Sequence, residues 1–416
     1  MAAMSNVVVV GAGPAGSSAA FWLAKAGVDV TLVEKKSFPR EKTCGDGLTP
    51  RAIYELQLMG YNFDFERPGL HRVTGLRSYG GPELKLEMQW PEHSKFPNWG
   101  AIVRRRYLDH DVVKLAVTAG AKLHEKTTAE PVVDGGRVTH VDLIKDGERE
   151  RIAADYVVIA DGTLSRFGRV LGTSRRRDYP MGLAARGYFD SPRSTDPFME
   201  SQLYITDATG AAMPGYGWIF PLGDGTVNVG VGLLSTFKRW KDVNTTDMMH
   251  AYSGSAPSEW ELTNPTPHRG GKLSMALSVG PKAGPNWIAV GDAAGAINPW
   301  NGEGISYAYE TGRIAAGFVI DAIKTNSPGH LMAYPDFLEE EYGDYYRFAR
   351  LFVKAIGQPW IMSTLTKTGL RSKPLMEWVL KVMANLLEEE EKKTAEHAYY
   401  MLERLVRMAP GRLVAR

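Results

Sequence analysis

The stretch that decides the fold is residues 7–16, VVVVGAGPAG, which is followed at residues 29–34 by DVTLVE. Four consecutive valines predict a parallel strand that is buried on both faces. Glycines at positions 11, 13 and 16 give the spacing GxGxxG between this strand and a helix expected at residues 17–26, which Gly27 can end. The second apolar run completes a βαβ unit. We therefore expect an α/β fold built on a parallel sheet.

The glycine turn predicts a Rossmann-like dinucleotide site. Glycines permit a tight turn and the close approach of a pyrophosphate, which then lies at a helix N-terminus. Glu34 ends the second strand about 20 residues later, where a carboxylate accepts hydrogen bonds from ribose hydroxyls and repels a 2′-phosphate. FAD and NAD(H) both fit this motif. The residues assigned to the cofactor here are Gly11, Gly13, Pro14, Ala15, Gly16, Glu34 and Lys35.

The composition is that of a globular protein of two or three domains, with 416 residues, 44% of them hydrophobic, and a net charge of +2. Basic and acidic residues nearly balance, so no nucleic-acid partner is expected. The only cysteine, Cys44, has no partner for an intramolecular disulfide, which favours the cytoplasm. The sequence has no uncharged apolar run of about 18 residues, so no membrane-spanning helix is predicted. No metal-ligand spacing occurs, so no metal is expected.

Three later segments resemble the flavoprotein hydroxylase superfamily, whose FAD domain is assembled from distant parts of the chain. They are VRRRYLD at 103–109, DYVVIADG at 155–162 and WIAVGDAAGAINPWNGEG at 287–304. The resemblance implies FAD as the bound cofactor, with Arg105 facing its phosphates or ribose, Asp292 its ribityl and pyrophosphate region, and residues 299–305 its isoalloxazine ring. It adds the cofactor contacts Asp161, Gly162, Gly291, Pro299, Gly302, Gly304 and Ile305.

A physical argument supports a charged group in front of the last of these segments. Gly302 and Gly304 precede a helical stretch at 305–320, so backbone N–H groups and the positive end of a helix point at whatever lies before them. A reduced flavin carries negative charge on its N1/O2 side, which such a helix end stabilises. The alternative is an ordinary glycine-rich helix start.

Residues 181–284 differ from the rest of the sequence in their pattern of apolar residues. Alternating runs such as GLAARGYF, SQLYI, GYGWIFPLG and TVNVGVGLL are separated by turn residues and predict an antiparallel sheet. Such a sheet over the flavin would roof a substrate cleft. We expect an FAD domain at 1–70, 100–178 and 285–330, a substrate domain at 71–99 and 179–284, and a C-terminal helical region at 331–416.

Two motifs resemble the geranylgeranyl reductase family. MPGYGWIFP at 213–221 is similar to its Y-x-W-x-F-P signature, although Met213 stands where the family often has proline, and TCGDGLTPRA at 43–52 resembles its cysteine-glycine loop beside the flavin. The resemblance extends from about residue 6 to about residue 390 and is greatest to actinobacterial members that reduce one isoprene double bond of the menaquinone side chain.

The resemblance implies an FAD-dependent reductase that saturates a C=C bond in an isoprenoid or quinone side chain, by hydride transfer from reduced flavin and protonation. A geranylgeranyl diphosphate or lipid reductase, and an FAD-dependent monooxygenase of an apolar substrate, are the alternatives. The electron donor stays open between NAD(P)H and another reductant. Strand alternation puts Tyr216, Trp218 and Phe220 on one face, which suits a prenyl chain but is also typical of sheet core.

The site assignments follow from these motifs. The proposed substrate contacts are Tyr216, Trp218, Phe220, Pro221 and Trp300. The residues placed beside the flavin by the resemblance are Cys44, Gly45, Asp46 and Gly47. Proton donors by residue type are Cys44, Asp46 and Tyr216, with water relayed through them equally possible.

The segment from Arg347 to Lys381 carries seven basic residues against one acid, interleaved with apolar residues that include Trp360 and Trp378. Basic residues and interfacial tryptophans in short helices are typical of segments that lie on an anionic membrane surface. The alternative is a helical cap packed on the substrate domain. We expect a cytoplasmic protein that is peripheral on the inner face of the cell membrane.

Overall fold

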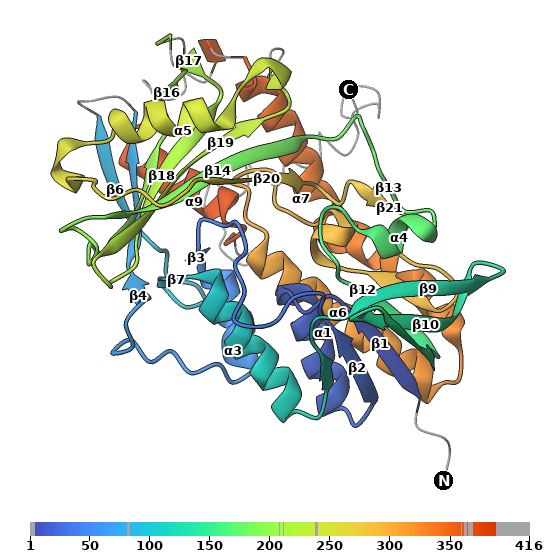
Figure 1. The fold of residues 1–416 in the computed structure, drawn as a ribbon. Coiled ribbons are helices and arrows are strands. Elements are labelled where there is room, and N and C mark those ends of the chain that lie inside the picture. Colours follow the sequence, from blue (N-terminus) through green and yellow to red (C-terminus); the bar gives the residue numbers. More distant parts are fainter. Residues whose placement is uncertain are drawn as a thin grey trace.

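The computed structural model describes residues 5–80, 84–207, 209–210, 212–237, 240–358, 360–361, 364 and 369–387. At its base lies a sheet of five parallel strands in the order β22-β12-β1-β2-β8 (Figure 1). Their bounds are β1 (Asn6–Val10), β2 (Asp29–Val33), β8 (Lys122–His124), β12 (Tyr156–Ile159) and β22 (Trp287–Ala289). The strands come from widely separated segments, and the predicted fold class, a Rossmann-like sheet of the flavoprotein hydroxylase type, is confirmed.

The four valines of β1 are explained by the two layers that cover this sheet. Val7 and Val9 pack with α1 (Pro14–Lys25), α3 (Arg105–Thr118) and α6 (Ile305–Lys324). Val8 and Val10 pack with the antiparallel sheet of β9 (Thr128–Asp134), β10 (Arg137–Lys145) and β11 (Glu148–Ala153). Side chains alternate along a strand, so a strand between two apolar layers must be apolar at every position. Helix α1 begins three residues before the predicted start, because Pro14 already has the backbone angle of a first helical residue.

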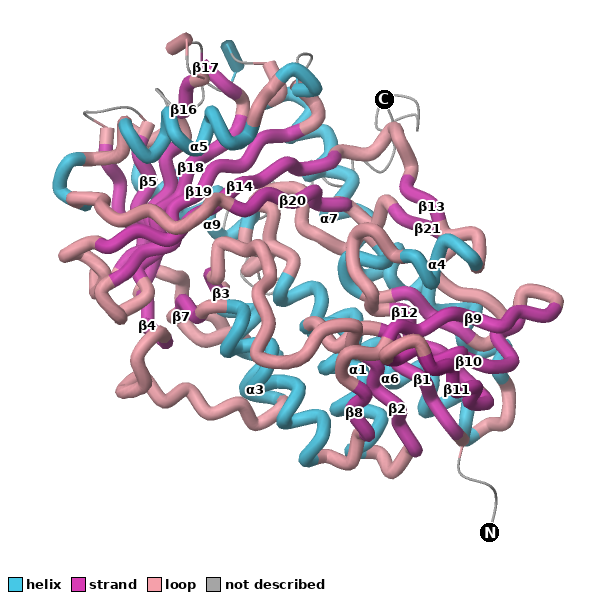
Figure 2. Tube along the Cα trace, viewed as in Figure 1, coloured by secondary structure: helices cyan, strands magenta, loops and turns pink. Residues whose placement is uncertain are grey.

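A second sheet forms the upper part of the molecule (Figure 2), with seven strands in the order β20-β14-β19-β18-β15-β5-β6. The strands are β5 (Gly75–Tyr79), β6 (Lys85–Gln89), β14 (Met181–Asp190), β15 (Phe198–Gln202), β18 (Gly215–Pro221), β19 (Thr226–Leu234) and β20 (Arg269–Ser274). The expectation of an antiparallel sheet holds for every neighbouring pair except β15 and β5, which are parallel. That pair joins segments more than a hundred residues apart, for which no hairpin sets the direction.

The two faces of the second sheet have different covers. On one face, Ile219 of β18 and Val229 of β19 pack under α5 (Thr245–Gly254). On the other face, Met199 and Phe220 belong to a cluster that includes Leu380 of α9 (Lys373–Met383). The face opposite α5 therefore looks toward the rest of the molecule, where the small sheet β3 (Gly47–Leu48), β7 (Gly100–Val103) and β4 (Leu70–Val73) lies (Figure 1).

The C-terminal helices pack on both parts of the molecule. Helix α7 (Tyr334–Ile356) buries Tyr342, Tyr345 and Tyr346 in the cluster that contains α6. The other helices and strands are α2 (Pro50–Leu58), α4 (Arg166–Val170), β13 (Ser174–Arg175), β16 (Ile205–Thr206), β17 (Ala212–Met213) and β21 (Val279–Gly280). The last part of the expected C-terminal region, from residue 388, lies outside the described residues.

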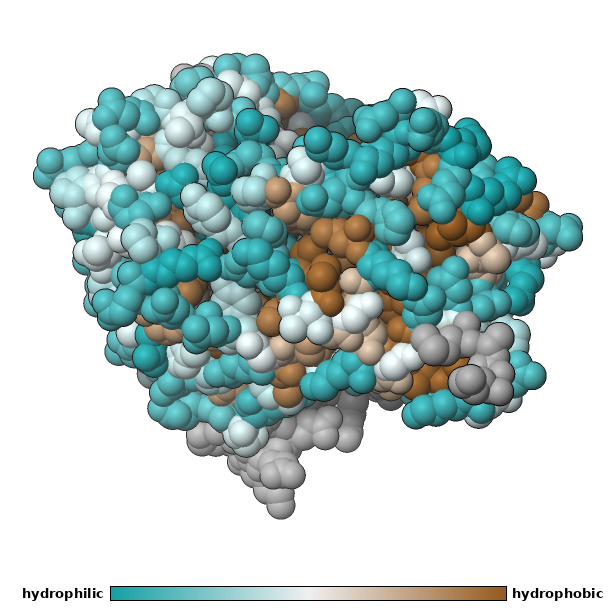
Figure 3. All heavy atoms as spheres, turned by 60° about the horizontal axis from the view of Figure 1, so that its bottom comes forward, coloured by the Kyte–Doolittle hydropathy of each residue, from teal (hydrophilic) through white to brown (hydrophobic). Residues whose placement is uncertain are grey.

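Among the described residues, no helix has the length and apolarity needed to cross a membrane. The face drawn in Figure 3 is mostly polar, with apolar side chains gathered near its centre and toward one side. Trp22, Gly317 and Ile320 help to line a groove between α1 and α6.

The contact between α1 and α6 provides a test of the fold. A Cβ on Gly312 would lie 2.3 Å from the carbonyl oxygen of Ala15, whereas one on Gly317, in the same helix, would meet nothing within 4 Å. We expect Gly312→Ala to lower the free energy of unfolding by about 1–3 kcal/mol through overpacking. Gly317→Ala should leave it unchanged or raise it by about 0.5–1 kcal/mol. Urea unfolding followed by circular dichroism measures both, and equal effects of the two substitutions would contradict this packing.

Candidate FAD site

The turn between β1 and α1 forms an open cradle. A Cβ on Gly11 would lie 2.5 Å from the carbonyl oxygen of Ala160, and one on Gly16 would lie 1.8 Å from that of Gly11, so packing requires both glycines. Gly13 has only the Arg40 guanidinium near the position of its missing side chain, at 3.8 Å. No side chain caps α1, because Gly13 is its N-cap residue. The first N–H groups of α1 are therefore left for an external acceptor such as a phosphate.

Glu34 lies beside this cradle. Its carboxylate accepts hydrogen bonds from the backbone nitrogens of Ala12 (3.3 Å) and Lys36 (3.0 Å). The Nε atom of Arg40 is 3.3 Å from the same carboxylate, and its Nη1 atom is 3.0 Å from Asp109. The predicted place of Glu34, at the end of β2 and next to the start of α1, is thus what a ribose-binding acid requires. Lys35 is exposed, and Arg40 is a neighbour that the sequence did not reveal.

Arg105 is held differently from the expectation. Its guanidinium is buried and donates to both carboxylate oxygens of Asp109, at 2.6 and 3.0 Å. Because Asp109 is four residues later on α3, the pair lies on one helix face. The positive charge that was assigned to the cofactor phosphates is therefore balanced within the protein, by an acid that is also bonded to Arg40.

The carboxylate of Asp46 holds the loop that contains Cys44. Asp46 is fully buried and has a left-handed backbone (φ 67°). It accepts hydrogen bonds from the Tyr188 hydroxyl (2.7 Å), the Asn228 amide (2.8 Å) and the backbone nitrogen of Arg105 (3.2 Å). Burial raises the pKa of Asp46, and these hydrogen bonds oppose that effect. With both oxygens engaged and no exposed surface, Asp46 positions the loop, and its assignment as a proton donor loses support.

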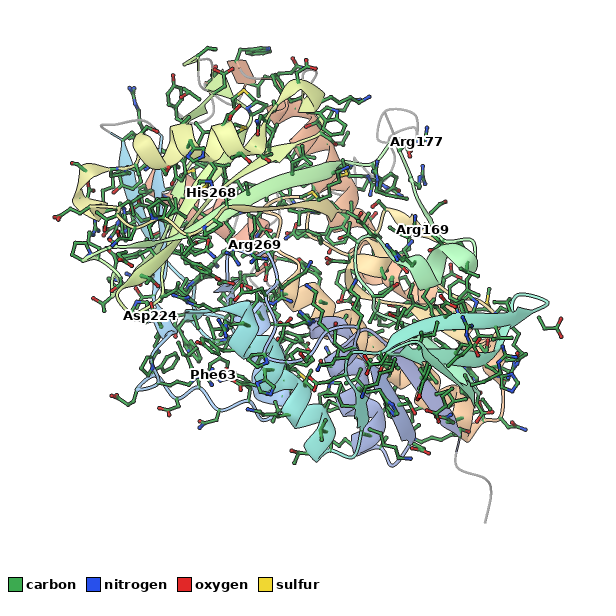
Figure 4. All side chains as sticks on the ribbon, in the orientation of Figure 1. Phe63, Arg169, Arg177, Asp224, His268 and Arg269 are labelled. Atoms are coloured by element: carbon green, nitrogen blue, oxygen red, sulfur yellow. The ribbon has the colours of Figure 1, made fainter. Side chains whose placement is uncertain are left out.

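Tyr188, on β14, is itself held between two cations. Its ring lies 4.4 Å from the guanidinium carbon of Arg104 and 4.3 Å from that of Arg186. Arg104 also donates to Asp224, at 3.2 Å, in the turn that links β18 to β19. Figure 4 labels Asp224 near α3, which starts just after Arg104. The start of α3 and the second sheet are therefore joined directly.

The loop with Cys44 packs on the aromatic side chains of β18. Ring centroids are 5.9 Å apart for Tyr216 and Trp218 and 6.2 Å apart for Trp218 and Phe220, so the three rings share one face, as alternation predicts. A Cβ on Gly45 or on Gly47 would lie 3.2 Å from the Phe220 ring. The contact with the Phe220 ring leaves little room for a side chain at either position.

Tyr216, Trp218 and Phe220 form an aromatic wall on β18, and hydrogen bonds to neighbouring segments fix it. The indole nitrogen of Trp218 donates to the Asn228 side chain at 2.9 Å, and the Asn228 amide donates to the Cys44 carbonyl at 2.9 Å. Cys44 is partly buried, and Pro221 is buried at the end of β18. Asn228 thus links the loop, the wall and Asp46.

A second loop, residues 298–304, approaches the same wall. The Tyr216 hydroxyl donates to the carbonyl oxygen of Asn301 at 2.6 Å, and a Cβ on Gly302 would lie 3.8 Å from that hydroxyl. Burial raises the pKa of Tyr216 to about 12, so the phenol is neutral. Trp300 was expected to contact substrate, but its ring contacts are with Tyr345, Phe348 and Phe352 of α7. Pro299 and Ile305 are buried at the two ends of the loop.

The remaining predicted residues connect this loop to α1. A Cβ on Gly304 would lie 3.6 Å from Asp292, whose other oxygen accepts from Thr163 at 3.1 Å. A Cβ on Gly291 would lie 2.8 Å from the Ala15 Cβ. Gly162 has a φ of 87° and follows Asp161. Asp161 accepts from the first backbone nitrogens of α4, and its other oxygen is buried without a partner in the described structure.

These observations fit FAD. The open helix N-terminus and Glu34 suit the adenosine and phosphate half, while Asp292 and the loop before α6 continue from α1 toward Tyr216 and Cys44. The described residues contain no group of histidine, cysteine or acidic side chains that could hold a metal ion. Fold and site therefore define an FAD-dependent oxidoreductase.

Comparison with known proteins agrees. A family model described as an FAD binding domain matches residues 4–316. The chain is 39% identical over 390 residues to the menaquinone reductase of Mycolicibacterium smegmatis, with 93% of each chain covered. It is 31% identical to digeranylgeranylglycerophospholipid reductase 1 of Methanopyrus kandleri, with 83% of this chain and 88% of the relative covered. The chain belongs to the geranylgeranyl reductase family of FAD-dependent oxidoreductases.

A solved structure supports the fold. The crystal structure of a geranylgeranyl bacteriochlorophyll reductase-like protein from Thermoplasma acidophilum has a TM-score of 0.78 at 24% identity, and the match covers 96% of this chain and all of that one. The predicted fold class, family and FAD cofactor are therefore confirmed.

The hydrogen bonds around Asp46 give the prediction for this site. Tyr188→Phe removes one donor and keeps the ring between its two arginines, so we expect a loss of about 0.5–1.5 kcal/mol in the free energy of unfolding. Asp46→Asn replaces one carboxylate oxygen by an NH₂ group, which cannot accept a hydrogen bond. At least one of the three donors then has no acceptor, so the loss in the free energy of unfolding should be larger, about 1–3 kcal/mol. Chemical denaturation measures both effects, and an equal stability of wild type and Tyr188→Phe would count against the network.

Proposed function

We propose that this protein uses reduced FAD to saturate one C=C bond in the prenyl side chain of menaquinone. The observation that carries the proposal is the packing of the loop around Cys44 on the rings of Tyr216, Trp218 and Phe220, next to the loop before α6. The similarity to the relative named menaquinone reductase, which covers 93% of the chain, supports the proposal.

The residues present account for what such a reaction needs from the protein. FAD, once bound and reduced, supplies a hydride to one alkene carbon. A prenyl chain is apolar, and its burial against aromatic rings is worth about 25 cal/mol per Å². An isolated alkene has no carbonyl to polarise, so rate depends on holding the bond in place and on an acid in a site that excludes water. Tyr216, fixed by Asn301, contributes to the positioning.

The first test is direct. Holoenzyme reduced anaerobically with dithionite is mixed with menaquinone, and mass spectrometry follows the quinone. Because dithionite also reduces the quinone ring, which adds two hydrogen atoms, the products are reoxidised in air before mass spectrometry. We then expect the prenyl chain to keep the mass of two added hydrogen atoms, and a control with dithionite and no enzyme to show no change. Digeranylgeranyl lipids and geranylgeranyl diphosphate are run in parallel, because one relative is named as a lipid reductase.

The outcomes separate the alternatives. Saturation of the lipid and not of menaquinone would replace the substrate and keep the chemistry. If no substrate is saturated and oxygen is consumed when substrate is added in air, the protein is a monooxygenase and the proposal is wrong.

We also propose that the protein lies on the membrane that contains such a substrate. Part of the apolar set between 347 and 381 is unavailable for this, because Phe348 packs on Trp300 and Val353 is buried in the core. Among the described residues of this set, Trp360 is 69% exposed and Leu375 is 46% exposed. Lys373, at the start of α9, is 59% exposed and pairs with Glu377 at 3.8 Å, and Arg371, also exposed, adds positive charge near Leu375.

Flotation with anionic vesicles tests this association. We expect the wild type to float with the vesicles and the double variant Trp360→Ser, Leu375→Ser to float several-fold less, because interfacial apolar side chains are lost. Leu164→Ser is the control, since Leu164 is 75% exposed but lies between β12 and α4. The proposal is wrong if the wild-type protein stays in the soluble fraction. It is also wrong if Leu164→Ser lowers vesicle binding as much as the double variant does.

A further inference from the structure

Glu303 lies in the loop before α6, and the loop fixes its position. Its backbone nitrogen donates to the side chain of Asn301 at 2.9 Å, and its carbonyl oxygen accepts from the backbone nitrogen of Asn298 at 2.8 Å. Asn301 is also the residue that accepts from Tyr216. Glu303 is therefore tied to the loop that meets the aromatic wall of β18.

The two carboxyl oxygens of Glu303 have different surroundings. Oε1 accepts a hydrogen bond from the hydroxyl of Thr49, which belongs to the same segment as Cys44. Oε2 is buried and has no hydrogen-bond partner in the described structure. Burial raises the pKa of Glu303, and the hydroxyls of Ser306 and Thr49, the charge of Arg51 and the side chain of Asn301 oppose that effect. When Glu303 is protonated, Oε1 keeps the hydrogen bond from Thr49 and the proton lies on Oε2.

The cation that lowers the pKa of Glu303 is already paired with another acid. Arg51, on α2, is the nearest cation that lowers its pKa, but Arg51 donates to both oxygens of Glu310 at 2.9 and 2.7 Å. The positive charge of Arg51 is therefore balanced without Glu303. The other titratable neighbours are Tyr216 and Tyr307, whose own pKa values are raised by burial and further by Glu303.

Acid strength separates Glu303 from the tyrosine of the wall. The pKa of Tyr216 is raised to about 12, whereas that of Glu303 rises from 4.5. A carboxylic acid gives up a proton more readily than a phenol when both are buried. Glu303 is partly exposed as a residue, although its Oε2 atom is buried.

We propose that Glu303 is the proton source of the reduction, an inference that rests on the function proposed above. Reduced FAD gives a hydride to one alkene carbon and is oxidised, and the other carbon takes the proton that leaves Oε2 of Glu303. One C=C bond is lost and two C–H bonds form. The carboxylate is reprotonated from solvent, and a two-electron reductant, dithionite in the test, reduces the flavin again.

The sign of the pH dependence follows. Because the pKa of Glu303 is raised, the donating form is complete at low pH and is lost as pH rises through that pKa. Turnover of the reduced holoenzyme should fall with it. Thr49→Val removes a hydrogen bond that lowers the pKa, so the fall should move to higher pH.

The decisive variant is Glu303→Gln, which has the same shape and no acidic proton. We expect FAD content and reduction by dithionite to be unchanged, C=C reduction to fall by about 100-fold or more, and the alkaline fall in rate to disappear. Glu303→Asp should recover part of the rate. Difference infrared spectra of the substrate-free protein should show a protonated carboxyl band at neutral pH in the wild type that Glu303→Gln lacks.

The two proposals fail differently. Wild-type protein that saturates no prenyl substrate would overturn the proposed function, and this inference with it. Wild-type protein that turns over while Glu303→Gln keeps the same rate and pH profile would overturn this inference alone, as would the absence of a protonated carboxyl band assigned to Glu303.

Discussion

The buried carboxylate of Asp46 joins segments that are far apart in the chain, and the site depends on it. Its three donors come from β14, from β19 and from the start of α3. A charge removed from water is tolerated only when its hydrogen bonds are replaced, so the three donors and the carboxylate require one another. The loop around Cys44 is thereby held between the parallel sheet and the seven-stranded sheet.

The end of the chain completes the same construction from the other side. The side-chain amide of Asn298 donates to the Tyr345 hydroxyl and to the carbonyl oxygen of Met383, both at 3.0 Å, and Asn301 donates to Met383 at 3.1 Å. Helices α7 and α9 therefore hold the loop before α6 in place. The apolar faces of these helices serve the site, which explains why only a few of their apolar side chains are left for a membrane surface.

Local patterns in the sequence predicted those parts of the site that local geometry determines. The βαβ unit with Glu34 and the shared face of Tyr216, Trp218 and Phe220 depend on spacing alone, and the structure contains both. Contacts between residues that are far apart in the sequence could not be predicted from local patterns. The partner of Trp300 is α7, about fifty residues later, and no periodicity encodes that pairing.

Some of the missed residues did carry a signal. Asn228 is a polar residue at a fully buried position of an otherwise apolar strand, and a buried amide must have hydrogen-bond partners. Asp109 stands four residues after Arg105, a spacing that brings opposite charges together on a helix. The sequence alone could have shown that both residues need a partner. Only the fold shows that Asn228 is bonded to Asp46 and to Cys44.

Asp46 and Glu303 show that burial alone does not decide which acid can act. Burial raises the pKa of both carboxyls, and both belong to loops that meet the aromatic wall. In Asp46 both oxygens accept hydrogen bonds from donors of the protein, and Oδ2 accepts two of them. In Glu303 one oxygen is bonded and the other has no partner in the described structure, so it can carry and release a proton without disturbing its surroundings. The difference lies in hydrogen bonding, and it assigns position to the first acid and proton chemistry to the second.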